Sequence, residues 1–158
     1  DRFEMPSEPD LKQLSMGQKK KAYMSFALAT GTKILLMDEP TNGLDIPSKE
    51  LFRQVIAGAM DESRTLVIST HQVHDVETLL DAVVIIDNGR VLFNHGMGEI
   101  ADTYSFNYLK SQQQAADVLY SEPTLQGNAT VSFRKDGPET AVNLELLFNA
   151  VTLGKVRN

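Results

Sequence analysis

Three short runs of apolar and β-branched residues limit the fold of this chain more than any other feature: residues 33–37, 65–69 and 82–87. Each run has the length of a strand and almost no polar residue inside it. That pattern is typical of strands buried on both faces of a parallel sheet. Because helical patterns lie before and between these runs, the sequence favours alternating helices and strands.

The first helical pattern covers residues 16–30, which contain good helix formers and no proline. Ser15 is placed to cap its start and Gly31 to end it. Two further helices are predicted, over residues 45–60, where Asp45 is the candidate cap, and over residues 72–80.

A turn signal follows the third strand. Asn88-Gly89 predicts a hairpin, so residues 90–95 should return antiparallel to residues 82–87. The resulting order of helix, strand, helix, strand, helix, strand, strand predicts an α/β fold with a mostly parallel sheet.

Beyond residue 100 the sequence changes character. Residues 100–114 are predicted to be helical, residues 118–120 and 129–134 to be strands, and a last helix is expected from about residue 143. That helix would carry four apolar side chains on one face: Leu144, Leu147, Phe148 and Val151. This face can pack on its own chain, on a second copy or on a membrane subunit, and the sequence leaves these alternatives open.

These patterns predict two parts. Residues 1–100 would form the α/β part, and residues 101–158 would form a small accessory α+β extension.

Composition limits the class of protein. At 158 residues, with 42% hydrophobic and 23% charged residues, the chain is long enough for a globular core. It has no cysteine, which excludes disulfides and thiolate metal sites. A net charge of −6 and a single basic run argue against a nucleic-acid partner. No apolar stretch approaches the roughly 18 residues of a membrane-spanning helix, so any membrane connection is expected through a partner.

Two adjacent carboxylates, Asp38 and Glu39, end the first strand. Side chains at the carboxyl end of a parallel strand can approach a ligand in the crevice there. One carboxylate can hold Mg²⁺ through water while the other polarises an attacking water. The simpler alternative is that the pair ends the strand in solvent.

A candidate anion site lies about twenty residues earlier, in "LSMGQ" at residues 14–18. Backbone N–H groups at a helix start attract anions, Gly17 permits close approach of a phosphate, and the Ser15 hydroxyl adds a donor. Taken alone, the same residues are simply a serine-capped helix.

Together, three segments resemble a known family. "LSMGQ", then "ILLMDEPTNGLD" at residues 34–45, then Ser69-Thr70-His71 look like the signature motif, Walker B motif with D-loop, and switch histidine of the ATP-binding cassette (ABC) ATPases. The three motifs follow the family's order and spacing. The resemblance covers residues 11–99.

The resemblance implies a role for each matching residue. Asp38 would bind Mg²⁺ through water, Glu39 would orient or deprotonate the hydrolytic water, and His71 would contact the γ-phosphate of ATP. Four residues of the signature motif and the D-loop would act at a nucleotide site shared with a second ATPase subunit. They are Ser15, Gly17, Gln18 and Asp45.

Two departures from the family pattern stand out. Met16 occupies a position where the family usually has glycine, so altered contact with the partner's nucleotide is expected. The phosphate loop, Gly followed by four residues and Gly-Lys-Ser/Thr, is missing, because none of the ten glycines has another five positions later. The chain is therefore expected to be a carboxyl-terminal fragment that cannot hydrolyse ATP alone.

The resemblance implies a transport-coupled ATPase subunit that works with transmembrane subunits and lies on the cytoplasmic, inner face of the cell membrane. Two alternatives remain at this point. One is an ABC ATPase with a non-transport task, and the other is a dimerisation or regulatory module formed by residues 101–158.

Overall fold

The computed structural model describes residue 10 and residues 12–110, 117–125, 127–135 and 137–157. The chain forms two compact units, Asp1–Leu79 and Leu80–Asn158. The division predicted after residue 100 is a boundary between an ATPase part and an extension, which is a different boundary from that between the two compact units. It stays a prediction.

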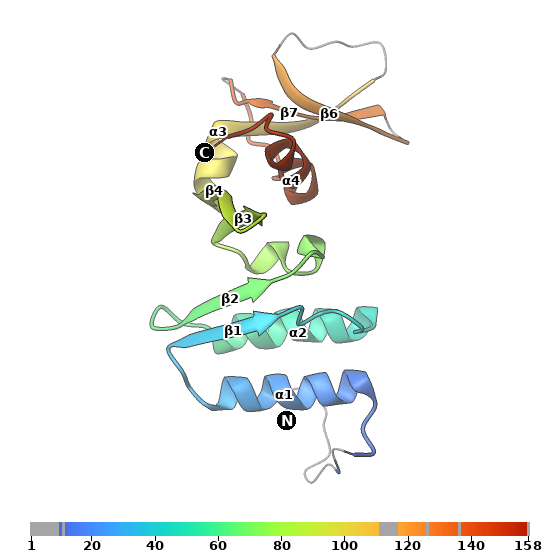
Figure 1. The fold of residues 1–158 in the computed structure, drawn as a ribbon, viewed down its shortest axis with the longest axis vertical. Helices are drawn as coiled ribbons and strands as arrows, with labels where there is room; N and C mark the ends of the chain where they lie inside the picture. The colour runs from blue at the N-terminus through green and yellow to red at the C-terminus, as the bar shows by residue number, and fades with distance from the viewer. Residues whose placement is uncertain (1–9, 11, 111–116, 126, 136, 158) are drawn as a thin grey trace. The chain divides into compact units, whose positions relative to one another are not determined.

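The first unit contains the parallel strands expected from the sequence. Its elements are α1 (Met16–Ala29), β1 (Ile34–Asp38), α2 (Ile46–Ala59) and β2 (Thr65–Ser69), as Figure 1 shows. β1 and β2 pair in parallel and in register, from Ile34 opposite Thr65 to Asp38 opposite Ser69. Because parallel strands end at the same edge, the residues that follow both strands emerge side by side.

Both long helices of this unit begin at the predicted caps. The Ser15 hydroxyl accepts a hydrogen bond from the Gln18 N–H at 3.2 Å, and the Ser15 N–H donates to Gln18 Oε1 at 2.9 Å, which completes a capping box. Asp45 Oδ1 accepts from the Ser48 N–H at 3.0 Å at the start of α2. These caps confirm the predicted starts of α1 and α2.

The helix predicted over residues 72–80 is wrong. The segment forms two short 3-10 turns instead, η1 (Val73–Asp75) and η2 (Glu77–Leu79). The Val76 N–H donates to the Val73 carbonyl, and the Leu79 N–H donates to the Val76 carbonyl. These three-residue spacings are those of 3-10 turns, which are rarely extended.

One face of the β1–β2 pair is open to solvent. Along both strands, exposed and half-buried side chains alternate. Ile34, Leu36 and Val67 are the large apolar side chains on the exposed face, while Met37 and Ile68 point to the opposite face.

The second unit begins with the predicted hairpin. β3 (Ala82–Asp87) and β4 (Arg90–Gly96) pair antiparallel across Asn88 and Gly89. Both turn residues have positive φ, 47° and 74°, as a tight two-residue hairpin requires. Among the described residues of the second unit, β3 pairs with β4 in a two-stranded sheet. The mixed α/β class is confirmed, although its sheets are small.

A three-stranded antiparallel sheet follows α3 (Met97–Thr103). It contains β5 (Tyr104–Leu109), β6 (Val118–Thr124) and β7 (Gly127–Phe133), in the order β5-β7-β6. The helix predicted over residues 100–114 is therefore wrong beyond Thr103, and its last residues lie outside the described part of the chain.

The reason for this error lies in the pairing of β5. The whole of β5 pairs with β7, and it buries alternate aromatic side chains, Tyr104 and Phe106, at a period of two residues. Gly127 allows β7 to approach β5, since a Cβ there would lie 2.4 Å from the Leu109 carbonyl oxygen.

The last helix, α4 (Leu144–Thr152), packs on its own unit. It contacts β3, β4, β6 and β7. Of the four side chains predicted to share one apolar face, Leu144, Leu147 and Val151 are buried, whereas Phe148 is 46% exposed. Leu146 and Ala150 are buried as well. Packing on the same chain is therefore the alternative that the structure supports.

Among the described residues, no helix combines the length and the apolar character that crossing a membrane requires.

Truncation of α4 tests this core. We expect Leu147→Ala to lower the free energy of unfolding by about 2–5 kcal/mol, because it empties a fully buried site. Phe148→Ala is the matched control on the same helix and should cost less than about 1 kcal/mol. Urea unfolding of the 158-residue chain measures both, and equal losses would contradict the packing of α4.

Candidate functional site

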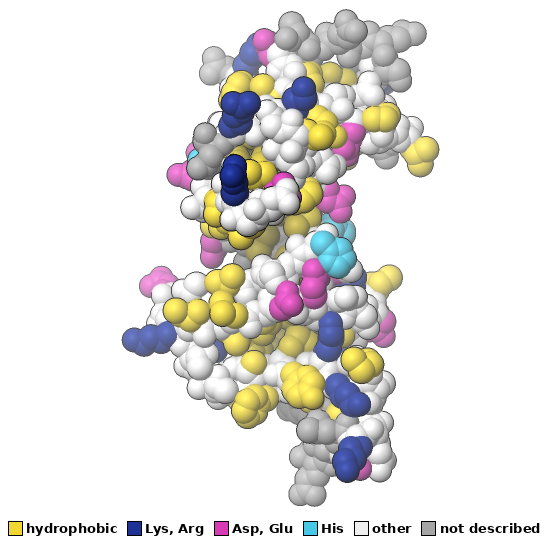
Figure 2. Space-filling model, in the orientation of Figure 1, with side chains coloured by type: hydrophobic (Ala, Val, Ile, Leu, Met, Phe, Trp, Pro, Cys, Tyr) yellow, Lys and Arg dark blue, Asp and Glu magenta, His cyan; other side chains and the backbone are white. Residues whose placement is uncertain are grey.

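The candidate site forms where β1 and β2 end. Asp38 lies opposite Ser69 in the sheet, and the Glu39 N–H continues the pairing by donating to the Ser69 carbonyl at 2.8 Å. The next residues along the second strand, Thr70 and His71, therefore face Glu39. In Figure 2, acidic side chains and a histidine gather over this region of the first unit.

Glu39 is held by three hydrogen bonds from the segment after β2. Its Oε1 accepts from the His71 backbone N–H at 3.0 Å and lies 2.6 Å from His71 Nδ1. Its Oε2 accepts from the Thr70 hydroxyl at 3.0 Å. The hydrogen bond with the His71 side chain is the largest cause that lowers the pKa of Glu39 below its ordinary value, so the side chain is an anion at neutral pH.

The backbone of Glu39 adopts a conformation that a sequence-based prediction does not anticipate. Its φ is +45°, in the left-handed region that residues other than glycine seldom enter. Such a residue costs on the order of 1–3 kcal/mol and persists where the surroundings hold it. Here the bond to Ser69 holds the backbone, and those from Thr70 and His71 hold the side chain.

Asp38 is exposed and accepts a hydrogen bond from the Ser69 hydroxyl. Among the described residues, no group of three or more His, Asp or Glu side chains could enclose a metal ion. Mg²⁺ does not need such a cage, because it is commonly held by one or two carboxylates with water and substrate phosphates. The exposed Asp38 carboxylate is therefore a hard oxygen group of the kind that can hold Mg²⁺ through water.

The predicted nucleotide-binding residues of the signature segment lie at the start of α1. Ser15 and Gln18 are exposed, Gly17 has open space where a Cβ would be, and Met16 is 72% exposed as the first helical residue. Within the part of the chain that the structure describes, no hydrogen bond or ion pair links Ser15, Gly17 or Gln18 to Glu39 and His71.

Sequence reasoning missed one residue that joins these segments. Lys20 lies on α1, and its Nζ donates to the Glu39 carbonyl at 3.0 Å and to the Asn42 carbonyl at 2.5 Å. The sequence shows Lys20 only as one of three consecutive lysines, a pattern typical of a solvated helix face. No sequence signal distinguishes it from its neighbours, because its role depends on how α1 packs.

Asp45 already has a local structural role. Its side chain accepts the Ser48 N–H. A hydrogen bond with the Ser48 side chain is the largest cause of the lowered pKa of Asp45, and the bond from the Ser48 N–H is the next. Just before it, Thr41 is fully buried and Gly43 has a φ of +75°. The segment between Glu39 and α2 is thus a defined turn, and Asp45 is its last residue.

Comparisons with known proteins agree with the motifs. No protein-family model matches the chain. The chain is 34% identical over 89 residues to the ABC transporter ATP-binding protein NatA of Bacillus subtilis, which covers 56% of this chain and 36% of NatA. It is 25% identical over 137 residues to the daunorubicin/doxorubicin resistance ATP-binding protein DrrA of Streptomyces peucetius, which covers 86% of this chain and 42% of DrrA. The chain thus spans less than half the length of these curated relatives.

Two solved structures share the fold at low sequence identity. One is described as a candidate metal-chelate type ABC transporter in an inward-facing conformation, with a TM-score of 0.52, 16% identity, and coverage of 82% of this chain and 51% of the other. The second is described as a candidate cobalt transport ATP-binding protein, with a TM-score of 0.53, 17% identity, and coverage of 88% and 51%.

The contact between His71 and Glu39 can be tested by titration. We expect His71→Ala to raise the pKa of Glu39 toward its ordinary value of 4.5, because the largest lowering contact is removed. A carboxyl group whose pKa is lower in the folded state than in the unfolded state stabilises the fold at every pH above its unfolded-state pKa. This stabilisation is lost as the pH falls through the folded-state pKa.

Carboxyl ¹³C NMR of Glu39 measures the shift. His74→Ala is the matched control, because His74 pairs with Glu77 at 3.2 Å in the neighbouring turn. If Glu39 titrates at the same pH in His71→Ala and in the unchanged chain, the contact does not exist in solution.

Proposed function

This chain is related to the ATP-binding proteins of ABC transporters, and from that relationship we propose that it is part of a subunit that couples ATP hydrolysis to membrane transport. The observation that carries the proposal is the position of Glu39, a carboxylate at the end of one strand that is held by Thr70 and His71 from the next. A fixed anion at the carboxyl edge of a parallel pair is suited to a reaction of a bound phosphate ester.

In ATP hydrolysis, separate roles would fall to Asp38, Glu39 and His71. Asp38 would hold Mg²⁺ through water, and the ion when bound would neutralise charge on the phosphates of ATP. Glu39 would position the hydrolytic water. Its lowered pKa makes it a weak base, so we favour orientation of the water over complete removal of its proton.

His71 can face a phosphate without leaving Glu39. Its Nδ1 contacts Glu39, while the imidazole is 69% exposed and presents Nε2 away from that contact, 3.4 Å from the Gln72 amide nitrogen. A histidine fixed at one ring nitrogen has a defined orientation at the other, which suits contact with a γ-phosphate.

A second ATPase subunit would complete the site. We propose that Ser15, Gly17 and Gln18 contact the nucleotide bound by that subunit, through the exposed start of α1. Asp45 would meet the same subunit across the interface. Transmembrane subunits would be the further partners, and the assembly would lie on the cytoplasmic face of the cell membrane.

Within this proposal, residues 1–100 are the part of the ATPase domain that carries these motifs, and residues 101–158 are an accessory extension. The sequence contains no glycine-lysine phosphate loop, so the 158 residues by themselves have no cradle for the β- and γ-phosphates.

Turnover of ATP tests the assignment of Glu39. In a full-length protein that carries these residues, Glu39→Gln should lower the rate of phosphate release by about 100-fold or more and leave ATP binding intact, because the amide keeps the shape but cannot act as an anionic acceptor. Glu62→Gln is the control, since Glu62 is exposed in the turn that precedes β2, at the opposite end from the site.

Unchanged turnover in Glu39→Gln would reject the proposed role. The 158-residue chain alone is expected to release no phosphate, and release that depends on Glu39 would show that it needs no other segment.

A further inference from the structure

A buried acidic residue lies close to the candidate site without belonging to it. Asp75 ends the turn η1, four residues after His71, and is 8% exposed. Its Oδ2 lies 2.7 Å from Lys49 Nζ on α2. Burial raises the pKa of Asp75, but contacts with the side chains of Lys49 and Thr41 outweigh this effect and leave the pKa below its ordinary value.

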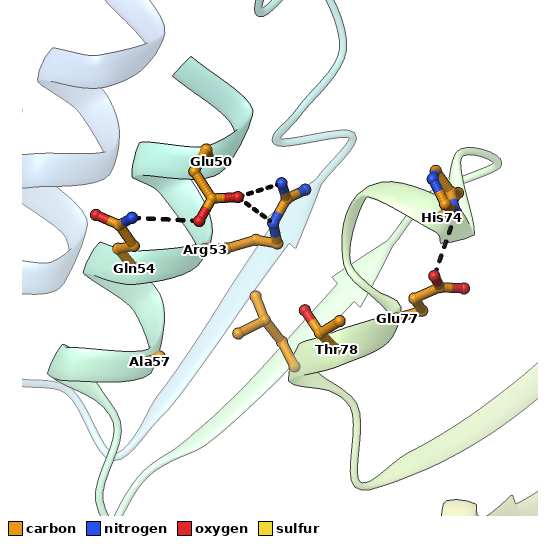
Figure 3. A pocket seen from close by; sticks show the side chains of 8 residues that line it. Glu50, Arg53, Gln54, Ala57, His74, Glu77 and Thr78 are labelled. Carbon is orange, nitrogen blue, oxygen red and sulfur yellow. Dashed lines mark hydrogen bonds and ion pairs between the residues drawn. The ribbon is translucent and has the colours of Figure 1, made fainter. Parts of the chain in front are cut away.

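The helix α2 holds this turn at more than one point. Arg53 Nη1 donates to the Asp75 carbonyl at 3.1 Å, and Lys49 Nζ also lies 3.5 Å from Gln72 Oε1. Lys49 and Arg53 are four residues apart, so they lie on the same face of the helix. Figure 3 shows Arg53 and its partner Glu50 on α2, opposite the turns that carry His74 and Glu77.

These contacts close a ring around the site. Residues 40–45 lead from Glu39 into α2, Lys49 of α2 pairs with Asp75, the turn leads back from Asp75 to His71, and His71 contacts Glu39 at 2.6 Å. The Lys49–Asp75 side chains are 24% and 11% exposed, whereas the His71 side chain is 69% exposed. The exposed histidine and the more buried ion pair thus belong to one closed ring of contacts.

We propose that Lys49 and Asp75 are a positioning pair, which fixes the turn 71–75 to α2 and thereby holds His71 against Glu39. The proposal rests on the proposed function in one respect: the pair affects catalysis only if Glu39 and His71 face a nucleotide. Neither Lys49 nor Asp75 would touch the nucleotide. Their effect would reach it through the orientation of His71.

Amide hydrogen exchange separates positioning from general stability. The His71 N–H donates to Glu39 Oε1, so its exchange reports the contact that the pair maintains. The Glu39 N–H donates to the Ser69 carbonyl, so its exchange reports the pairing of the strands. Both amides are read by NMR in the complete 158-residue chain without nucleotide.

In Lys49→Met and Asp75→Asn, we expect exchange at His71 to accelerate on the order of tenfold, with exchange at Glu39 within about twofold of the unchanged chain. Lys49→Arg should restore slow exchange at His71, because it keeps a cation near Asp75. Glu77→Gln is the matched control and should change neither amide, because it removes only the contact with His74.

Two results would overturn the proposal. One is unchanged exchange at His71 in folded Lys49→Met and Asp75→Asn, and the other is equal acceleration at His71 and Glu39. If either variant fails to fold, Lys49→Gln, which keeps a neutral hydrogen-bonding group at this position, provides the same comparison. Because no nucleotide is used, failure here rejects the pair alone, whereas unchanged ATP turnover in Glu39→Gln rejects the proposed function.

Discussion

The parallel, in-register pairing of β1 and β2 is the interaction on which the candidate site depends. It sets Asp38 opposite Ser69 and extends by one further hydrogen bond, from the Glu39 N–H to the Ser69 carbonyl. A shift of one residue would turn the side chains of one strand to the opposite face and separate the two strand ends. The residues after each strand would then no longer face one another.

The left-handed conformation of Glu39 follows from this constraint. The backbone of Glu39 is still paired to β2, so the chain must leave the sheet within one residue, directly before Pro40. The cost of that conformation, on the order of 1–3 kcal/mol, is offset by the bonds from Thr70 and His71. A strained residue whose side chain is an oriented anion is a common feature of functional sites.

How much could be predicted differs between the elements. The starts of α1 and α2 were predictable because a cap is local: Ser15 bonds to Gln18, and Asp45 bonds to Ser48. The hairpin at Asn88 was predictable for the same reason. The strand at Tyr104 was not, because β5 is defined by pairing with β7, whose partner residues lie 19 to 29 positions away. The exposure of Phe148 was equally unpredictable, since the rotation of α4 about its own axis against the neighbouring strands determines which side chains are buried.

The α/β class, the strands at residues 33–37 and 65–69 and the acidic residues that end the first of them could be read from sequence alone, because strand periodicity and caps act over a few neighbours. The packed fold was needed to show that Glu39 is held by Thr70 and His71, that Lys20 bonds to the Glu39 carbonyl, and that Lys49 contacts Asp75. The difference comes from separation along the chain. Each of these contacts joins residues at least 19 positions apart, and their meeting depends on how helices and strands pack.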